Sequence, residues 1–234
     1  HDQSSAASDV YKRQRQGREP SLVAGHSLGE LVALYAAGVF DAATGLELMQ
    51  RRSELMSTAG GGAMTAVIGF DRDQLNALVA DTADVVIAND NSEAQVVLSG
   101  SPEAVGSVSE ALTCKRAIPL AVSGAFHSPF MANAADAFSA HLDTLTFADA
   151  RMPVLSNTDP TPSSDGSELK QRLRQQMTTG VRWRETMEAL TAAGVDTLVE
   201  IGPGNVLSGL AKRSMRGVTS LSLIHISEPT RRTI

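Results

Sequence analysis

The sequence predicts an α/β fold in which a smaller subdomain interrupts a larger core, and two stretches carry that prediction. In the first, a short apolar run leads into GHSLGE at residues 25–30, after which apolar residues recur with helical spacing. Strand, Gly-x-Ser-x-Gly and helix in this order form the nucleophile elbow of α/β-hydrolase cores. In the second, residues 63–122 follow the order β-α-β-β-α-β, which is the ferredoxin-like arrangement. We therefore expect an α/β-hydrolase-like core at 15–60 and 123–220, interrupted by a ferredoxin-like subdomain at 61–122.

The individual elements follow from caps, glycines and apolar spacing. Gly38 is expected to end the elbow helix, and Asp41 to cap a second helix that runs to about Met56. Residues 60–62 form a glycine joint, and residues 89–92 are the expected turn between the two middle strands of the subdomain. The other expected strands are 63–70, 85–88, 95–99, 116–122, 153–157 and 197–201, and the other expected helices are 71–81, 102–112, one ending near 145, 167–177 and 183–193.

Ser27 is the candidate nucleophile. Gly25 and Gly29 flank it at two residues' distance, where we expect a Cβ atom to clash in so sharp a turn. The backbone N–H of Leu28, at the start of the following helix, is placed to donate to an oxyanion. A glycine-rich turn with an incidental serine is the alternative, and the strand before it and the helix after it favour the nucleophile.

Arg52 is unusual because it lies on an apolar stripe. Its neighbours at three and four residues' distance on the helix are all apolar: Leu48, Met49, Leu55 and Met56. A buried, unpaired charge is very costly, so an arginine in this position needs an anion. Two alternatives stay open, namely that Arg52 reaches the surface or that it meets an internal acid.

A serine nucleophile needs a base within hydrogen-bond reach, and elimination among the histidines favours His127. His26 adjoins Ser27 on a tight turn, so we expect their side chains to diverge, and His141 lies within an amphipathic helix. No third member of a triad stands out. Asp136, Asp159 and a backbone carbonyl that orients the imidazole all stay open.

Composition limits the function classes. The 234 residues carry 20 basic and 26 acidic side chains, a net charge of −6, which argues against a nucleic-acid surface. The single cysteine, Cys114, excludes an internal disulfide and is compatible with a reducing cytosol. No apolar stretch approaches the roughly 18 residues of a membrane span, and no signal-peptide pattern opens the sequence.

The two ends of the chain share an unusual coding relation. Residues 9–14 can be encoded by GATGTGTATAAGAGACAG, and the reverse complement of that string encodes residues 221–226. The string is the transposon end used to prepare sequencing libraries. We therefore expect residues 1–14 and 221–234 to be derived from adaptor DNA and to lie outside the native fold.

Four motifs occur together in order: residues 25–30, Arg52, GAFHSP at 124–129 and Gly-Pro-Gly at 202–204. Over essentially all of residues 15–220, this combination resembles the malonyl-CoA:acyl-carrier-protein transacylases of type II fatty acid synthesis. Several spaced motifs that agree in order are a far more specific signal than Gly-x-Ser-x-Gly alone.

The resemblance implies roles for six residues besides the oxyanion donor Leu28. Ser27 carries the malonyl group as an ester, His127 is its base, and Arg52 binds the malonyl carboxylate. Gln176 aligns with a glutamine whose backbone carbonyl orients the histidine, so that the site needs no acid. Phe126 matches the malonyl-selective form, and Asn91 falls near the substrate pocket.

The resemblance also implies that malonyl-CoA and the phosphopantetheine thiol of acyl carrier protein are the substrates of a cytoplasmic, monomeric enzyme without metal or redox cofactor. The family has an N-terminal strand and a Gly-Gln-Gly-type loop whose glutamine N–H is the second oxyanion donor. Nothing like this loop precedes Ser21. We therefore expect the chain to be a fragment that lacks its N-terminal part.

Three alternatives stay open. An acyltransferase module of a polyketide synthase shares the motifs. A serine hydrolase or thioesterase would use water in place of the thiol, and Arg52 on its apolar stripe disfavours this alternative, since a hydrolase of neutral esters has no use for a buried cation. A non-catalytic docking protein would have an inert Ser27.

Overall fold

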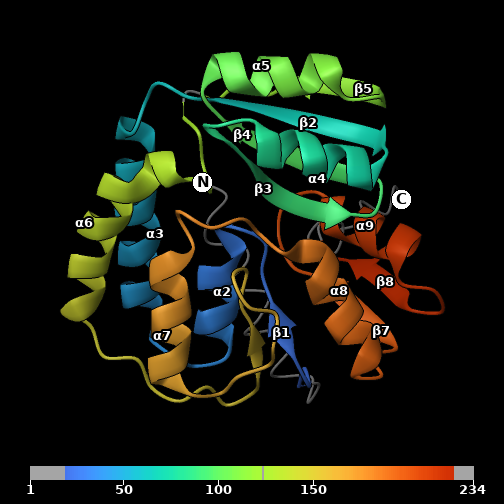
Figure 1. The fold of residues 1–234 in the computed structure, drawn as a ribbon. Helices are drawn as coiled ribbons and strands as arrows, with labels where there is room; N and C mark the ends of the chain where they lie inside the picture. The colour runs from blue at the N-terminus through green and yellow to red at the C-terminus, as the bar shows by residue number, and fades with distance from the viewer. Residues whose placement is uncertain (1–18, 123, 224–234) are drawn as a thin grey trace, which may run out of the picture. The chain divides into compact units, whose positions relative to one another are not determined.

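A computed structural model describes residues 19–122 and 124–223, and the chain divides into two compact units (Figure 1). The larger unit is Ser21–Thr186, and the described helices and strands of the smaller unit follow from Met187 onward. Helices and strands are interspersed along the described residues, as expected for a mixed α/β fold. Among the residues described, none belongs to a helix long and apolar enough to cross a bilayer.

In the larger unit, the strand that enters the elbow lies in a short parallel sheet. β1 (Val23–Ala24) pairs with β6 (Val154–Leu155), so that Ala24 lies beside Leu155. Helices pack beside one another next to this pair: α2 (Gly29–Ala36), α3 (Ala42–Thr58), α6 (Ala132–Asp143), which follows the 3-10 turn η1 (Pro129–Met131), and α7 (Gly166–Gln175) (Figure 1). They share one apolar core whose fully buried members include Leu31, Leu34, Leu48, Phe138, Leu142, Leu169 and Leu173.

The expected limits of the first helices are confirmed. Gly38 has a φ of 80°, a left-handed conformation that favours glycine, and it ends α2. The Asp41 side chain accepts a hydrogen bond from the Thr44 N–H at 2.9 Å and caps α3. These local signals fix where α2, the helix after Ser27, ends and where α3, the helix that carries Arg52, begins.

A second sheet in the larger unit has four antiparallel strands in the order β3-β4-β2-β5. The strands are β2 (Ala63–Phe70), β3 (Val85–Ser92), β4 (Gln95–Gly100) and β5 (Cys114–Pro119). Helices α4 (Arg72–Asp81) and α5 (Pro102–Ala111) contact each other and cover one face of the sheet (Figure 1). A second core fills the space between them, with Val67, Leu75, Val96, Leu98, Val105 and Val108 buried.

The expected turn at residues 89–92 is wrong. β3 continues through these residues to Ser92, and two register shifts let it accommodate them. The polar side chains have partners there: Asp90 receives two hydrogen bonds from Arg72, and its backbone N–H donates to the carbonyl of Val181. Because these partners lie elsewhere in the fold, a strand forms where local composition favours a turn.

The helix expected at 183–193 and the strand expected at 197–201 are present, and in the smaller unit a helix and a strand that the sequence did not predict follow them. α8 (Trp183–Ala192) begins in the larger unit, and then β7 (Thr197–Glu200), α9 (Val206–Ser214) and β8 (Thr219–Ser222) follow. β7 and β8 are parallel, and the Glu200 carboxylate accepts from the N–H groups of Leu207 and Ser208 at the start of α9. β8 includes two residues of the segment expected to lie outside the fold, whereas residues 1–14 and 224–234 lie outside the described residues.

Candidate active site

Ser27 stands in a sharp turn between β1 and α2. Its φ is 52°, a left-handed conformation that is strained for a residue with a side chain. The turn is held from both sides, because the Ser27 N–H donates to Asn157 Oδ1 at 2.7 Å and the Glu30 N–H donates to the Ser27 carbonyl at 3.1 Å. This strand, strained serine and helix form the nucleophile-elbow geometry that the sequence predicts.

The two glycines of the turn are not equivalent. A Cβ atom on Gly25 would lie 1.9 Å from the carbonyl oxygen of Gly29, whereas a Cβ atom on Gly29 would meet nothing within 4 Å. The expectation that both glycines prevent a clash is therefore confirmed for Gly25 and wrong for Gly29.

This difference predicts opposite effects of two alanine substitutions on stability. Gly25→Ala forces backbone against backbone and should lower the free energy of unfolding by about 3 kcal/mol or more. Gly29→Ala fills open space in the first turn of a helix and should stay within about 1 kcal/mol of the unsubstituted protein. Urea denaturation followed by circular dichroism measures both, and equal losses would contradict the prediction.

His127 is 3% exposed and lies against the serine. Its Nε2 is 2.8 Å from Ser27 Oγ, and its Nδ1 is 2.9 Å from the backbone carbonyl oxygen of Gln176. Because a carbonyl only accepts, Nδ1 carries the proton, which leaves the Nε2 lone pair to accept from the serine hydroxyl. Neither Asp136 nor Asp159 hydrogen-bonds to His127, so the backbone carbonyl occupies the place of a triad acid.

The environment keeps His127 neutral. Burial lowers its pKa to about 4, and the nearby charge of Arg52 adds to the lowering. An imidazole in this state has a free lone pair at neutral pH, as a base for the serine hydroxyl requires.

This lowered pKa sets the expected pH profile of Ser27 acylation. Activity requires the neutral imidazole, so the rate falls as pH drops through the pKa of about 4. Between about pH 7 and about pH 5 the rate should change less than about twofold, whereas a histidine with the ordinary pKa would lose about 25-fold. The amount of acylated Ser27 after a fixed short reaction time, measured at each pH, gives the profile. Circular dichroism verifies that the protein stays folded.

Arg52 is 3% exposed, so it does not reach the surface. Its Nε donates to Gln176 Oε1 at 2.9 Å, and its Nη2 donates to Ser27 Oγ at 3.2 Å. Burial lowers its pKa to about 10, and the charge of Glu30 opposes the lowering, so the guanidinium is still a cation at neutral pH. Both of these hydrogen-bond acceptors are neutral. The Arg52 guanidinium therefore lies beside the serine as a cation that forms no direct ion pair with any described side chain.

Gln176 joins the other site residues together. Its backbone carbonyl holds His127 and its side-chain oxygen accepts from Arg52. Its side-chain nitrogen donates to the Ser27 carbonyl at 2.9 Å and to Glu30 Oε2 at 2.6 Å. The sequence assigned a role to the backbone of Gln176 alone, by resemblance, and it missed the side chain.

Two further residues of the site were missed. Glu30 is fully buried, and Asn157 holds the elbow by accepting from the Ser27 N–H and donating to the Gly25 carbonyl at 2.6 Å. Glu30 had no signal, because acidic residues are common in the first turn of helices and most of them are exposed. Asn157 had none, because it follows a two-residue strand in a proline-rich loop.

The other expected residues lie around this centre. Leu28 is the N-cap of α2 and packs against the core, and Phe126 packs against the apolar clusters on both sides of its loop. Asn91 does not touch the serine; its Oδ1 is 2.8 Å from His26 Nε2, and the His26 ring meets Trp183 edge-on. Among the described residues no cluster of His, Cys, Asp or Glu side chains could hold a metal ion.

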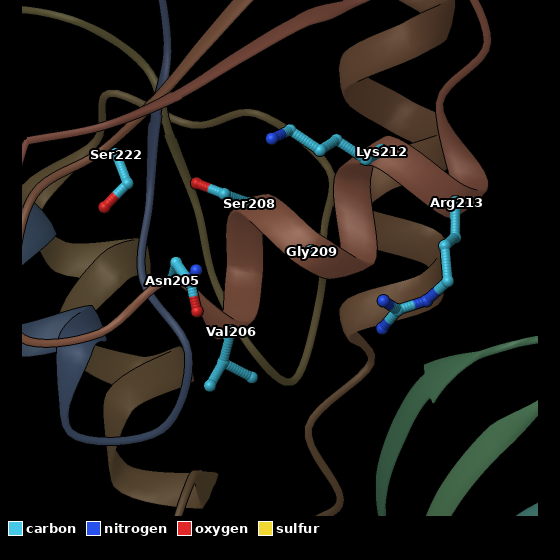
Figure 2. Close-up of a pocket in the computed structure, with 7 residues that line it drawn as sticks. All are labelled: Asn205, Val206, Ser208, Gly209, Lys212, Arg213 and Ser222. Carbon is cyan, nitrogen blue, oxygen red and sulfur yellow. The ribbon is translucent and has the colours of Figure 1, made fainter.

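A pocket in the smaller unit is no competing site for this chemistry (Figure 2). Its lining residues are Asn205, Val206, Ser208, Gly209, Lys212, Arg213 and Ser222. The hydroxyls of Ser208 and Ser222 donate to the carbonyls of Leu221 and Gly204, so neither serine is paired with a base. The larger unit contains the only described pairing of a serine hydroxyl with a histidine nitrogen.

A strained serine, a neutral histidine base and a helix start beside them define a serine-nucleophile enzyme of acyl transfer. Comparison with known proteins narrows the class. The acyl transferase domain family matches residues 5–227. A malonyl CoA-acyl carrier protein transacylase of Synechocystis is 53% identical over 199 residues, which cover 85% of this chain and 68% of the relative.

Solved structures agree. The crystal structure of a Synechocystis malonyl-CoA:ACP transacylase superposes with a TM-score of 0.91 and 49% identity, over 93% of this chain and 74% of the other. A malonyl-transacylase in complex with a type II PKS acyl-carrier protein superposes with a TM-score of 0.89 and 37% identity, over the same shares. The chain therefore belongs to the acyl transferase domain family, among the malonyl CoA-acyl carrier protein transacylases.

Proposed function

We propose that this chain transfers a malonyl group from malonyl-CoA to the phosphopantetheine thiol of acyl carrier protein through a malonyl ester on Ser27. The observation that carries the proposal is the buried guanidinium of Arg52, whose Nη2 is 3.2 Å from Ser27 Oγ. Malonyl differs from a neutral acyl group by a carboxylate one methylene away from the carbonyl that the serine attacks. A cation at this distance from the nucleophile fits that carboxylate.

In the first half-reaction, Ser27 Oγ attacks the thioester carbonyl of malonyl-CoA while His127 Nε2 takes the hydroxyl proton. The negative charge that develops on the carbonyl oxygen faces the N–H of Leu28 at the start of α2. The carbon–sulfur bond then breaks, and the leaving CoA sulfur takes the proton from His127. Malonyl-Ser27 and free CoA thiol remain.

In the second half-reaction the same groups act in reverse. His127 takes the proton of the phosphopantetheine thiol, and the sulfur attacks the ester carbonyl of malonyl-Ser27. The carbon–oxygen bond to Ser27 breaks, and His127 returns its proton to Oγ. The balanced result is transfer of malonyl between two thiols, which provides the elongation unit of fatty acid synthesis.

Two further residues belong to the substrate site in this proposal. Phe126 precedes the base directly, and its ring forms the wall that favours malonyl over branched acyl groups. Asn91 acts through His26, to which it hydrogen-bonds, and it keeps that imidazole turned away from the serine. In this proposal Phe126 and Asn91 shape the substrate pocket and do not take part in the chemistry.

The proposal includes a finer description of the fold. The strand order β3-β4-β2-β5, with both helices on one face, supports a ferredoxin-like subdomain at residues 61–122. The parallel pair β1 and β6 beside the strained serine supports an α/β-hydrolase-like core in the flanking segments. In this arrangement the subdomain returns to the core at the loop that carries His127.

Intact-mass spectrometry after incubation with malonyl-CoA tests the proposal. The protein should gain one malonyl group, peptide mapping should locate it on Ser27, and Ser27→Ala should abolish the gain. Addition of carrier protein that bears phosphopantetheine should return Ser27 to its free form and malonylate the carrier. A malonyl group that survives Ser27→Ala, or the absence of any covalent gain, would refute the proposal.

The same experiment separates the transferase from a hydrolase. A hydrolase would release free malonate as rapidly without the carrier protein as with it, whereas a transferase keeps malonyl-Ser27 until a thiol arrives. A carrier protein from a polyketide system, used in place of one from fatty acid synthesis, tests the polyketide alternative. The structural match to a malonyl-transacylase bound to a type II PKS carrier makes that comparison informative.

A further inference from the structure

The carboxyl group of Glu30 lies at the centre of the site without touching any reacting atom. Glu30 is in the first turn of α2 and is fully buried. Its Oε2 accepts two hydrogen bonds, from Gln176 Nε2 at 2.6 Å and from the backbone N–H of Asn157 at 3.2 Å. Burial raises the pKa of Glu30, and these hydrogen bonds together with the charge of Arg52 oppose the rise.

The first contact determines which way the Gln176 carboxamide points. Its Nε2 donates to Glu30, which leaves Oε1 free to accept from Arg52 Nε. In the flipped orientation, the amide oxygen would face the carboxylate and the amide NH₂ would face an N–H donor, so both contacts would be repulsive. Glu30 and Arg52 therefore select one orientation of the amide that lies between them.

The second contact reaches the nucleophile by a separate route. Asn157 donates its backbone N–H to Glu30, and its side chain accepts from the Ser27 N–H. Gln176 donates to the Ser27 carbonyl from the other side. Both peptide groups of the strained serine are therefore held by residues that hydrogen-bond to Glu30, Gln176 through its side-chain amide and Asn157 through its backbone N–H.

We infer that Glu30 is a positioning residue of the transfer reaction: it orients the side-chain amide of Gln176 and holds the backbone of Asn157, and these two residues in turn hold Ser27 and Arg52 in line with His127. This inference rests on the proposed function and deepens it. The carboxylate contributes no proton and no contact to the substrate. Glu30 affects the reaction only through its hydrogen bonds to Gln176 and Asn157. Its effect should therefore depend on whether those partners are present, whereas the effect of a residue needed only for folding should not.

A double-mutant cycle tests the dependence. Glu30→Gln keeps the shape of the side chain but replaces one carboxyl oxygen by an NH₂ group that cannot accept a hydrogen bond, so kcat/KM for malonyl-CoA should fall about tenfold. Gln176→Met keeps the backbone carbonyl that holds His127 but removes the amide. In the Gln176→Met background, Glu30→Gln should change kcat/KM by less than about threefold, because the Gln176 amide is gone and only the longer contact to the Asn157 N–H, at 3.2 Å, is left. The same tenfold loss in both backgrounds would overturn the inference.

Two controls make the result unambiguous. Glu168→Gln removes a carboxylate from the first turn of another helix, α7, outside the site, and it should leave kcat/KM unchanged. Reaction of Ser27 with a fluorophosphonate reports the alignment of Ser27 and His127 without any malonyl group. If malonyl-CoA gives no label but the fluorophosphonate cycle shows the same coupling, the proposed function fails and the role of Glu30 stands. Additive losses with the fluorophosphonate overturn that role whatever malonyl-CoA does.

Circular dichroism and urea denaturation verify that each variant folds. If Glu30→Gln does not fold, Glu30→Asp keeps the charge but shortens the side chain by one methylene and so withdraws it from both amides. Glu30→Asp should then lose about tenfold in the parent background and less than about threefold in the Gln176→Met background, where only the contact to Asn157 can still be lost. Equal losses in the two backgrounds would again overturn the inference.

Discussion

His127→Ala is expected to slow malonylation of Ser27 by about 10²- to 10⁴-fold, the range for loss of a general base. Two side chains lie within hydrogen-bond reach of the hydroxyl, and of these the imidazole, with Nε2 2.8 Å from Oγ, can accept its proton, whereas the Arg52 guanidinium only donates. Its other nitrogen, Nδ1, donates to the Gln176 carbonyl, and this bond keeps Nε2 directed at the hydroxyl. Rapid-quench labelling with malonyl-CoA, analysed by intact mass, gives the rate constant.

A second histidine of the chain provides the control. His141 lies on α6, where its Nε2 pairs with Glu47 at 3.2 Å, and it has no contact with the serine. His141→Ala should label at the rate of the unsubstituted protein. If His127→Ala retained more than about a tenth of that rate, another group would be the base, and the role of His127 would be structural.

The pairing of Ser27 with His127 could be predicted because each residue leaves a local signal. Ser27 stands in a motif whose backbone geometry requires glycine at residue 25. His127 follows by elimination, because His26 adjoins the serine and His141 lies on a helix away from it. Arg52 was predictable for a third reason, since a cation among apolar neighbours on a helix conflicts with the ordinary pattern of burial.

The network that supports these residues could not be predicted, because its contacts join distant parts of the chain. The bond from Gln176 to Glu30 spans 146 residues, and the bond from Ser27 to Asn157 spans 130. Amides and carboxylates are common at the surface, and nothing in their local sequence marks these three as buried. Their burial depends on the packing of α2, α7 and the loop after β6 around one point.

The same limit explains the errors in the fold. Residues 89–92 have the composition of a turn, but the strand continues because Arg72 and Val181 provide partners for its polar groups. α9 was missed because Gly-Pro-Gly precedes it and suggests a loop, whereas the cap of that helix comes from Glu200 on the preceding strand. In each case a side chain outside the segment decides its conformation.

Arg52→Ala is expected to lower kcat/KM for malonyl-CoA by about ten- to a hundredfold, which corresponds to about 1.5–3 kcal/mol for one hydrogen bond to a charged group. A guanidinium binds both oxygens of a carboxylate through parallel N–H bonds, so it fixes the orientation of the malonyl group as well as its charge. Arg52→Lys keeps the charge but loses the two-point contact, and its kcat/KM should lie between those of the other two proteins.

Acetyl-CoA makes this prediction specific to the carboxylate. Bound acetyl leaves the buried guanidinium with neutral partners only, the Ser27 hydroxyl and the Gln176 amide oxygen. Removal of that cation should therefore leave kcat/KM for acetyl-CoA equal or improved. Arg51→Ala is the matched control, since Arg51 is the adjacent residue on α3, is largely exposed and lies 3.9 Å from Glu54. If Arg52→Ala weakened both substrates by the same factor, Arg52 would serve the fold of the site and would not select the malonyl group.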